Sequence, residues 1–291
     1  MAALDGVTVV DFSRQLPGPF ASRELLRLGA RVVKVEPPEG DLTPAGWYQA
    51  LNEEKEVLRW DARRDPPPEA LRAADVVLEG FRPGVFERLG LNVPATAILC
   101  SITGYGATGP RSADAGHDLN YLGYAGVLHD TAPALPPVQV ADLAAGAQAA
   151  VIEILAALLE RATTGRGSRI VVSMTHNAHR LAAHRLAGDP VPRLLTGGVA
   201  CYRVYETADR RHLTVAALEP RFWRNLCALL GRDDLVDRAF DPELPELEAV
   251  FRSRTLAEWR SELEGKDTCV GPVLTLSEAA AELATGEPRP G

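Results

Sequence analysis

The first part of the chain alternates short β-branched runs with one stretch of helical spacing. VTVVDF (7–12) and RVVKVE (31–36) are typical of buried strands, and ASRELLRLGA (21–30) between them has the apolar spacing of a helix. Two such strands joined through a helix form a β-α-β unit, whose strands run parallel. This pattern constrains the fold most, because a parallel sheet must be covered by helices.

The alternation continues along the chain. Strand-like runs at 75–81 and 97–103 enclose a short helical run at 84–90. A long apolar helix from Leu143 to Arg161 then leads to a strand at 170–174. Strands and helices that alternate in this way form a mostly parallel sheet with helices packed against it. The sequence therefore predicts an α/β fold.

The pattern changes from about Leu194. Residues 201–218 have the pattern of two strands around an Ala-Asp-Arg-Arg turn, and 220–231 have the spacing of an amphipathic helix. These features predict a second, smaller α+β domain. The predicted division is a large domain over 1–190, a small domain over 191–275, and a C-terminal tail over 276–291 that could return to the large domain.

Composition and local sequence exclude several classes of protein. A formal net charge of −8 disfavours general nucleic-acid binding, which rewards clustered Lys and Arg. The four cysteines lie far apart, so neither a zinc site nor a disulfide framework is expected. The N-terminal residues lack the pattern of a secretion signal. The most apolar window, 143–160, contains Gln148 and Glu153, which favours a buried helix over a membrane span. We therefore expect a cytoplasmic protein that neither spans a membrane nor holds a metal.

Several cations occupy places where an open α/β sheet binds ligands, near the ends of its strands. They are Arg14 in the turn SRQLPGPF, then Lys34, Lys55 and Arg59 around the second strand, and Arg82 after the third. Together they would suit a polyphosphate, although each alone is most often a solvated surface charge. Both interpretations remain open at this point.

Three candidate acid-base residues stand where helices are predicted to begin. Asp142 precedes the long helix, where the helix dipole would keep its carboxylate ionised and leave N–H groups for an oxyanion. His117 precedes Asp118, the predicted N-cap of another helix, and a helix N-terminus would keep the imidazole neutral, as a base must be. Glu219 precedes Pro220 at the start of a third helix. A capping role and a chemical role are both open for each.

Seven segments form one ordered set: LDGVTVVDFSRQLPGPFASRELLRLGARVVKVEPPEGD, VLEGFRPGVFERLGL, CSITGYGATGP, AGHDLNY, VADLAAG, GRGSRIVVSM and YETADRRHLTVAALEPRFW. In this order they resemble family III coenzyme A transferases, the group that includes α-methylacyl-CoA racemase. The resemblance runs from Leu4 to about Pro272. It implies a Rossmann-like large domain, a smaller domain, two chains that interlock as a homodimer, and an acyl-CoA substrate. It implies no cofactor beyond the coenzyme A moiety of that substrate.

The resemblance also implies roles for particular residues. VADLAAG carries the family's catalytic aspartate, which matches Asp142. The racemase branch is more similar, because its GHDxNY histidine matches His117 and its EP glutamate, which assists the histidine, matches Glu219. The coenzyme A contacts that carry over are Arg14, Leu16, Lys55 and Arg82.

The activity that the resemblance implies first is epimerisation of 2-methyl-branched acyl-CoA thioesters through an enolate, with His117 and Asp142 as the two bases. One alternative is a CoA transferase, in which Asp142 forms an anhydride and His117 is structural. A third is a non-catalytic CoA-binding homologue. The segments 61–74 and 129–137, which are shorter than in most members, favour that third interpretation, and the three intact candidate residues disfavour it.

Overall fold

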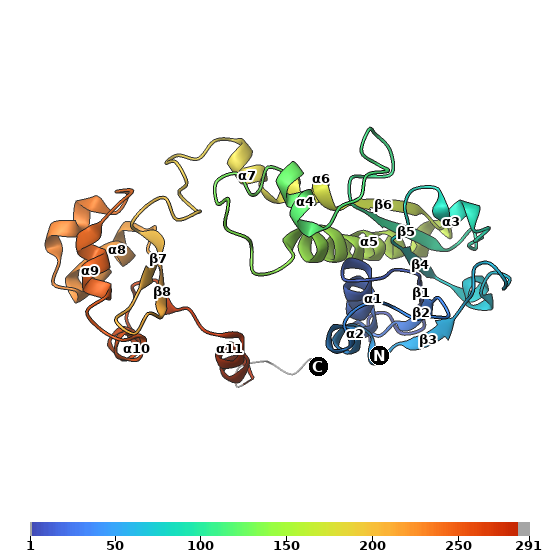
Figure 1. Cartoon of the computed structure of the whole chain (residues 1–291), viewed down its shortest axis with the longest axis horizontal. Coiled ribbons are helices and arrows are strands. Elements are labelled where there is room, and N and C mark those ends of the chain that lie inside the picture. The colour runs from blue at the N-terminus through green and yellow to red at the C-terminus, as the bar shows by residue number, and fades with distance from the viewer. Residues whose placement is uncertain (1, 285–291) are drawn as a thin grey trace. The chain divides into compact units, whose positions relative to one another are not determined.

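The computed structural model describes residues 2–284, and the chain divides into two compact units, Met1–Leu186 (the large unit) and Ala187–Gly291 (the small unit). The break falls at residue 186, where the sequence predicted 190. In the large unit all six strands run parallel, in the order β3-β2-β1-β4-β5-β6 (Figure 1). Their bounds are β1 Thr8–Asp11, β2 Arg31–Glu36, β3 Glu56–Arg59, β4 Val76–Glu79, β5 Ile98–Thr103 and β6 Arg169–Ser173. This is the order of a doubly wound Rossmann sheet, so the predicted fold class is confirmed.

Successive side chains of each strand point to opposite faces of this sheet, and both faces are buried at β1, β2, β4 and β5. On one face Val9, Leu78 and Ile98 join a core that α1 (Pro17–Arg27) and α5 (Ala149–Thr164) cover. On the other face, buried strand residues pack against Trp60 and against residues of α3 (Val85–Arg88) and η1 (Glu69–Ala73). The remaining helices of the large unit are α2 Ala45–Asn52, α4 Asp118–Tyr124, η2 Ala141–Gln148, α6 Met174–Leu181 and α7 Ala183–Leu186.

The long apolar helix begins earlier than predicted. A π-helical segment, η2, starts at Ala141 and continues directly into α5, so Asp142 lies inside the first turn and is not its N-cap. Residues 141–164 are long and apolar enough to cross a bilayer by length and composition alone. Ala145, Ala150 and Ile154 are nevertheless buried in the core, whereas Ile152 and Leu159 are exposed, so one face of the helix is buried as predicted.

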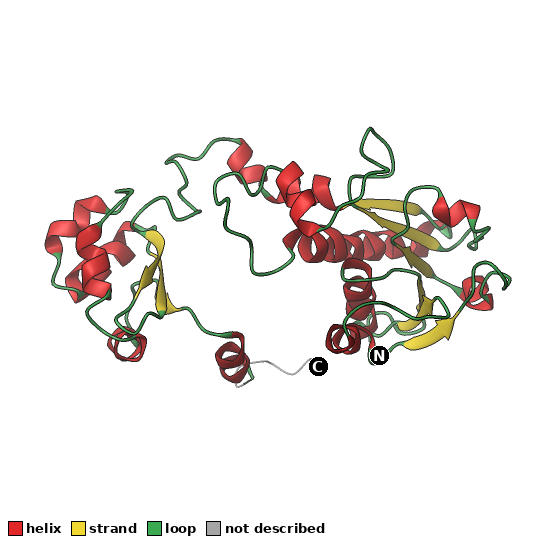
Figure 2. Cartoon of the chain, viewed as in Figure 1, coloured by secondary structure: helices red, strands yellow, loops and turns green. Residues whose placement is uncertain are grey.

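The small unit is an antiparallel sheet with helices (Figure 2). Its core contains Trp223, Phe251 and Trp259. The predicted tail begins with α11, and Glu278 of that helix pairs with Arg211 of the small unit at 2.8 Å. A return of the tail to the large unit stays a prediction, and residues 285–291 lie outside the described part of the chain. The elements are β7 Tyr202–Glu206, β8 His212–Ala216, α8 Pro220–Leu229, η3 Asp233–Arg238, α9 Pro245–Phe251, α10 Leu256–Leu263, β9 Val270–Pro272 and α11 Leu276–Leu283.

Candidate active site

A buried carboxylate shapes the turn between β1 and α1. Asp11 ends the strand, accepts the N–H of Ser13 at 2.8 Å, and also accepts the hydroxyls of Ser13 and Ser22. Gln15, two residues after Ser13, has a left-handed backbone with a φ of 66°. These contacts fix the course of the turn, and the Arg14 side chain is left exposed to solvent.

The loop after the neighbouring strand β4 repeats this arrangement. Buried Glu79 accepts the N–H of Phe81 at 2.6 Å, and Arg82 follows as an exposed residue. Arg14 and Arg82 therefore stand three residues beyond a buried acid on adjacent strands. Both line one cavity of about 490 Å³, which His117 also lines.

The prediction that cations near the strand ends are accessible to a polyphosphate is wrong for the two lysines, because both side chains are buried. The Lys55 ammonium donates to the carbonyl of Pro19 (2.8 Å), the hydroxyl of Ser22 (2.7 Å) and the side-chain oxygen of Asn52 (2.8 Å). Burial lowers the pKa of Lys55 to about 8. The Lys34 side chain is likewise fully buried. Because the Lys55 ammonium faces the chain itself, the geometry gives no support to a coenzyme A contact there.

The GHDLNY segment forms a tightly held helix entry. His117, not Asp118, is the N-cap of α4, and its N–H donates to Asn120 Oδ1 at 3.1 Å. The Tyr121 hydroxyl donates to the carbonyl of Gly116 at 2.5 Å. A Cβ at Gly116 would lie 2.7 Å from the Tyr121 ring, so this close approach requires glycine. The segment thereby fixes the backbone from which the His117 side chain projects.

Asp118 contacts the second candidate base instead of capping its own helix. Its Oδ1 accepts the backbone N–H of Asp142 at 2.9 Å. The N–H of Leu143 donates to the carbonyl of Gln139, also at 2.9 Å. The expectation that N–H groups at this helix start are available to an enolate oxygen is therefore wrong for these two groups.

Burial, with a smaller contribution from the Asp118 charge, raises the pKa of Asp142 to about 7. The prediction that the helix N-terminus keeps this carboxylate fully ionised is thus corrected. A carboxyl group near 7 can therefore both take and return a proton at neutral pH.

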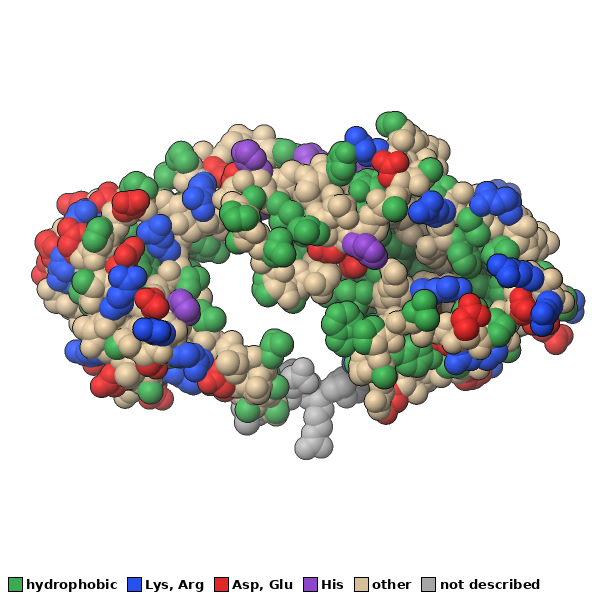
Figure 3. Space-filling model, in the orientation of Figure 1, with side chains coloured by type: hydrophobic (Ala, Val, Ile, Leu, Met, Phe, Trp, Pro, Cys, Tyr) green, Lys and Arg blue, Asp and Glu red, His purple; other side chains and the backbone are tan. Residues whose placement is uncertain are grey.

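His117 and Asp142 line the same cavity of about 580 Å³. Its wall is largely apolar and includes residues from several elements: Leu16, Leu42, Trp47, Leu119 and Leu135. In the face of the large unit shown in Figure 3, histidine and acidic side chains lie beside hydrophobic ones. This apolar cavity shares Arg14, Gln15 and His117 with the cavity that Arg82 lines. The site therefore joins a cationic part and an apolar part at His117.

A third cavity, of about 450 Å³, continues from Arg14. Arg63, Arg64, Trp60 and Phe81 line it, together with carboxylates. Arg63 and Arg64 were not among the predicted site residues, because a pair of charges in the loop after β3 carries no distinctive sequence signal.

Glu219 lies in the small unit, as the exposed N-cap of α8. Its partnership with His117, a residue of the large unit, stays a prediction. Leu16 is the N-cap of α1 and lines the apolar cavity. Among residues 2–284, no group of three His, Cys, Asp or Glu side chains could hold a metal ion.

Known proteins are similar to this chain over most of its length. Human alpha-methylacyl-CoA racemase is 34% identical over 305 residues, which cover 95% of this chain and 79% of the human protein. Mouse succinyl-CoA:glutarate CoA-transferase is 30% identical over 327 residues, which cover 97% and 74% of the two chains. The crystal structure of a CaiB/BaiF family protein from Brucella suis superimposes with a TM-score of 0.78 at 28% identity, covering 96% of this chain and 86% of that one. The family model of CoA-transferase family III matches residues 4–287, and the chain belongs to that family.

Proposed function

We propose that this chain is an α-methylacyl-CoA racemase-like enzyme, which epimerises the α-carbon of 2-methyl-branched acyl-CoA thioesters. One observation carries the proposal: His117 and Asp142 line a single cavity, and burial raises the pKa of the Asp142 carboxyl to about 7. Racemisation needs two groups that can each act as base and as acid near the same pH. The Asp142 carboxyl suits that requirement. We propose His117 as the second group and expect no cofactor beyond the coenzyme A moiety of the substrate.

The reaction follows from the acidity of the thioester. The carbonyl accepts the charge that develops when the α-proton leaves, and a flat enolate results. One base removes the proton from one face, and the conjugate acid of the other returns a proton to the opposite face. Contacts of Arg14 and Arg82 with the phosphates of coenzyme A would hold the thioester in place, so that remote binding energy positions the α-carbon. Glu219 would assist His117.

A CoA transferase is the second candidate, because a succinyl-CoA:glutarate CoA-transferase is among the relatives. In that reaction Asp142 would attack the thioester carbonyl and form a mixed anhydride. The cavity disfavours a dicarboxylic acyl group. Asp118 and Asp142 line it, and Arg14 is the one Arg or Lys among its described lining residues.

Incubation in deuterium oxide separates the two candidates. A single enantiomer of a 2-methylacyl-CoA, without an acceptor acid, should gain one deuterium and lose its chirality. Hydroxylamine, added with a free acceptor acid, should trap no acyl hydroxamate. A hydroxamate that Asp142→Asn abolishes, without deuterium uptake by the parent protein, would favour the transferase instead.

We further propose that the chain works as a homodimer in the cytoplasm. The support for the dimer is the family to which the chain belongs. Static light scattering at micromolar concentration should give about twice the mass of 31.3 kDa. A stable monomer would contradict the dimer.

A further inference from the structure

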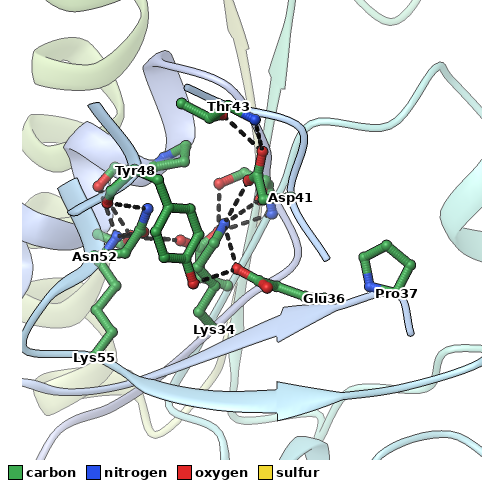
Figure 4. Close-up of polar contacts among 12 residues, drawn as sticks. Lys34, Glu36, Pro37, Asp41, Thr43, Tyr48, Asn52 and Lys55 are labelled. Carbon is green, nitrogen blue, oxygen red and sulfur yellow. Dashed lines mark hydrogen bonds and ion pairs between the residues drawn. The ribbon is translucent and has the colours of Figure 1, made fainter. Parts of the chain in front are cut away.

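A largely buried polar cluster includes Asp41 and Thr43, which line the apolar cavity, and the mechanism above does not use it. Figure 4 shows polar contacts among several of its residues. We call it the Lys34 cluster. It consists of Lys34, Glu36, Asp41, Thr43, Tyr48 and Arg59.

Lys34 is the centre of this cluster. Its ammonium donates to the carbonyl of Ser13 at 2.9 Å and lies 3.3 Å from Asp41 Oδ2 and 3.9 Å from Glu36 Oε1. The side chains of Lys34, Glu36 and Asp41 are each at most 2% exposed. Burying a charge without a partner is costly, so these contacts hold the three groups together. Through Ser13, the same ammonium also holds the turn that carries Arg14.

The two acids fix a surface segment at two points. Asp41 accepts the N–H of Thr43 at 2.9 Å and its hydroxyl at 2.7 Å. The Tyr48 hydroxyl donates to Glu36 Oε1 at 2.8 Å. Burial and this hydrogen bond raise the pKa of Tyr48 to about 12, so the hydroxyl keeps its proton at neutral pH. These hydrogen bonds therefore hold the loop before α2 and the first turns of α2 against the buried acids.

Each anchor has an exposed apolar neighbour in the chain. Leu42 follows Asp41 and is 89% exposed, and Trp47 precedes Tyr48 and is 66% exposed. This reverses the ordinary order, in which apolar side chains are buried and charged ones face solvent. Both apolar side chains line the cavity that contains His117 and Asp142. Large apolar groups held outward beside a reactive site indicate a surface for an apolar ligand.

We propose that Leu42 and Trp47 select the acyl group of the thioester, and that the Lys34 cluster positions them. The inference rests on the proposed function, because the thioester is what brings an apolar chain to His117 and Asp142. The occupant is the part of the acyl chain beyond the α-carbon. Tyr48 acts through Trp47 and is a positioning residue.

Calorimetric binding of coenzyme A and of two acyl-CoA thioesters, one short and one with a long branched chain, tests this proposal without turnover. The parent protein should bind the long thioester more tightly than the short one. We call the ratio of the affinity for the long thioester to the affinity for the short one the gain. Leu42→Ala and Trp47→Ala should each reduce this gain about tenfold and leave the affinity for coenzyme A itself unchanged. Tyr48→Phe keeps the lining atoms and removes the anchor, and it should reduce the gain by a smaller factor. Leu159→Ala, at an exposed leucine of α5 outside this cavity, is the matched control and should not change it.

The proposal is overturned if the parent protein shows no gain from the longer chain, or if Trp47→Ala retains it. It is also overturned if Leu42→Ala or Trp47→Ala changes the mass in solution, because the wall is then a protein interface. Parent protein that shows the gain but exchanges no α-proton would contradict the proposed function alone. If the parent protein exchanges the α-proton but the Trp47→Ala variant keeps the gain, the result contradicts this inference alone.

Discussion

The carboxylate of Asp118 accepts the backbone N–H of Asp142 at 2.9 Å and so joins the helix that His117 begins to the helix that carries the second candidate base. Asp118 thereby has two effects on Asp142. It fixes the backbone of that residue, and its negative charge adds to burial in raising the pKa of the Asp142 carboxyl. The GHD and VAD segments, 24 residues apart in this contact, act as one structural unit.

Asp118→Asn should move the pH dependence of catalysis. Asn can still accept the N–H of Asp142, but it lacks the charge that raises the pKa of that carboxyl. In the parent protein, the kcat/KM of the proton exchange that needs the Asp142 carboxylate should fall as the pH drops below about 7. In the variant this fall should begin at lower pH. The kcat/KM for deuterium uptake, measured from pH 5 to 9, checks it, and an unmoved profile would exclude an electrostatic role for Asp118.

Asp142→Asn should stabilise the fold while it removes activity. A carboxyl whose pKa is raised by folding binds its proton more tightly in the folded state, so its stabilising effect is present at low pH. That effect is lost as pH rises from about 4, the ordinary value for Asp, through about 7. At pH 8 the amide should therefore raise the free energy of unfolding by about 1 to 2 kcal/mol, allowing for solvent screening. Denaturation at pH 4 and pH 8 tests this, since the difference between the two proteins should nearly vanish at pH 4. A variant less stable at pH 8 would be inconsistent with a buried ionised carboxylate.

Arg82→Ala should weaken coenzyme A binding about tenfold at low salt, because a guanidinium that faces a phosphate makes a charge-assisted contact. The loss should shrink as salt rises, since exposed charges are screened. Arg27→Ala is the matched control, because Arg27 is also exposed but lines none of the three cavities described above. Equal affinity of the Arg82 variant and the parent at every ionic strength would remove Arg82 from the site.

The sequence predicted the buried parallel strands most closely. RVVKVE was predicted over 31–36, and β2 spans these residues, because a strand buried on both faces is a continuous β-branched run. The edge strand β3 was missed, since its four residues are all exposed and show no apolar pattern. Short α2 was missed with it, although it supplies Trp47 to the cavity.

Contacts between distant segments account for the errors at the site. Lys34 and Lys55 were predicted either to contact a polyphosphate or to be solvated surface charges, as lone lysines usually are. They are buried because acceptors 21 and 36 residues away, the carbonyls of Ser13 and Pro19, satisfy their ammonium groups. Asp118 was predicted as a helix cap because it stands at the start of a helix. Its contact with the N–H of Asp142 depends on how two helices pack, and the spacing of residues in the sequence does not reveal that packing. The pairing of His117 with Asp142 in one cavity followed from the family resemblance.

The most direct test of the two-base account is the uptake of deuterium by each enantiomer of a 2-methylacyl-CoA in deuterium oxide, with mass and chirality recorded together. Both enantiomers should exchange and invert with the parent protein. His117→Ala should fail to invert either one, yet it should still exchange, with retention, the enantiomer whose α-proton faces Asp142. Asp142→Asn should show the opposite selectivity. If His117→Ala inverts both enantiomers at the parent rate, His117 is only the start of a helix and the two-base account is wrong.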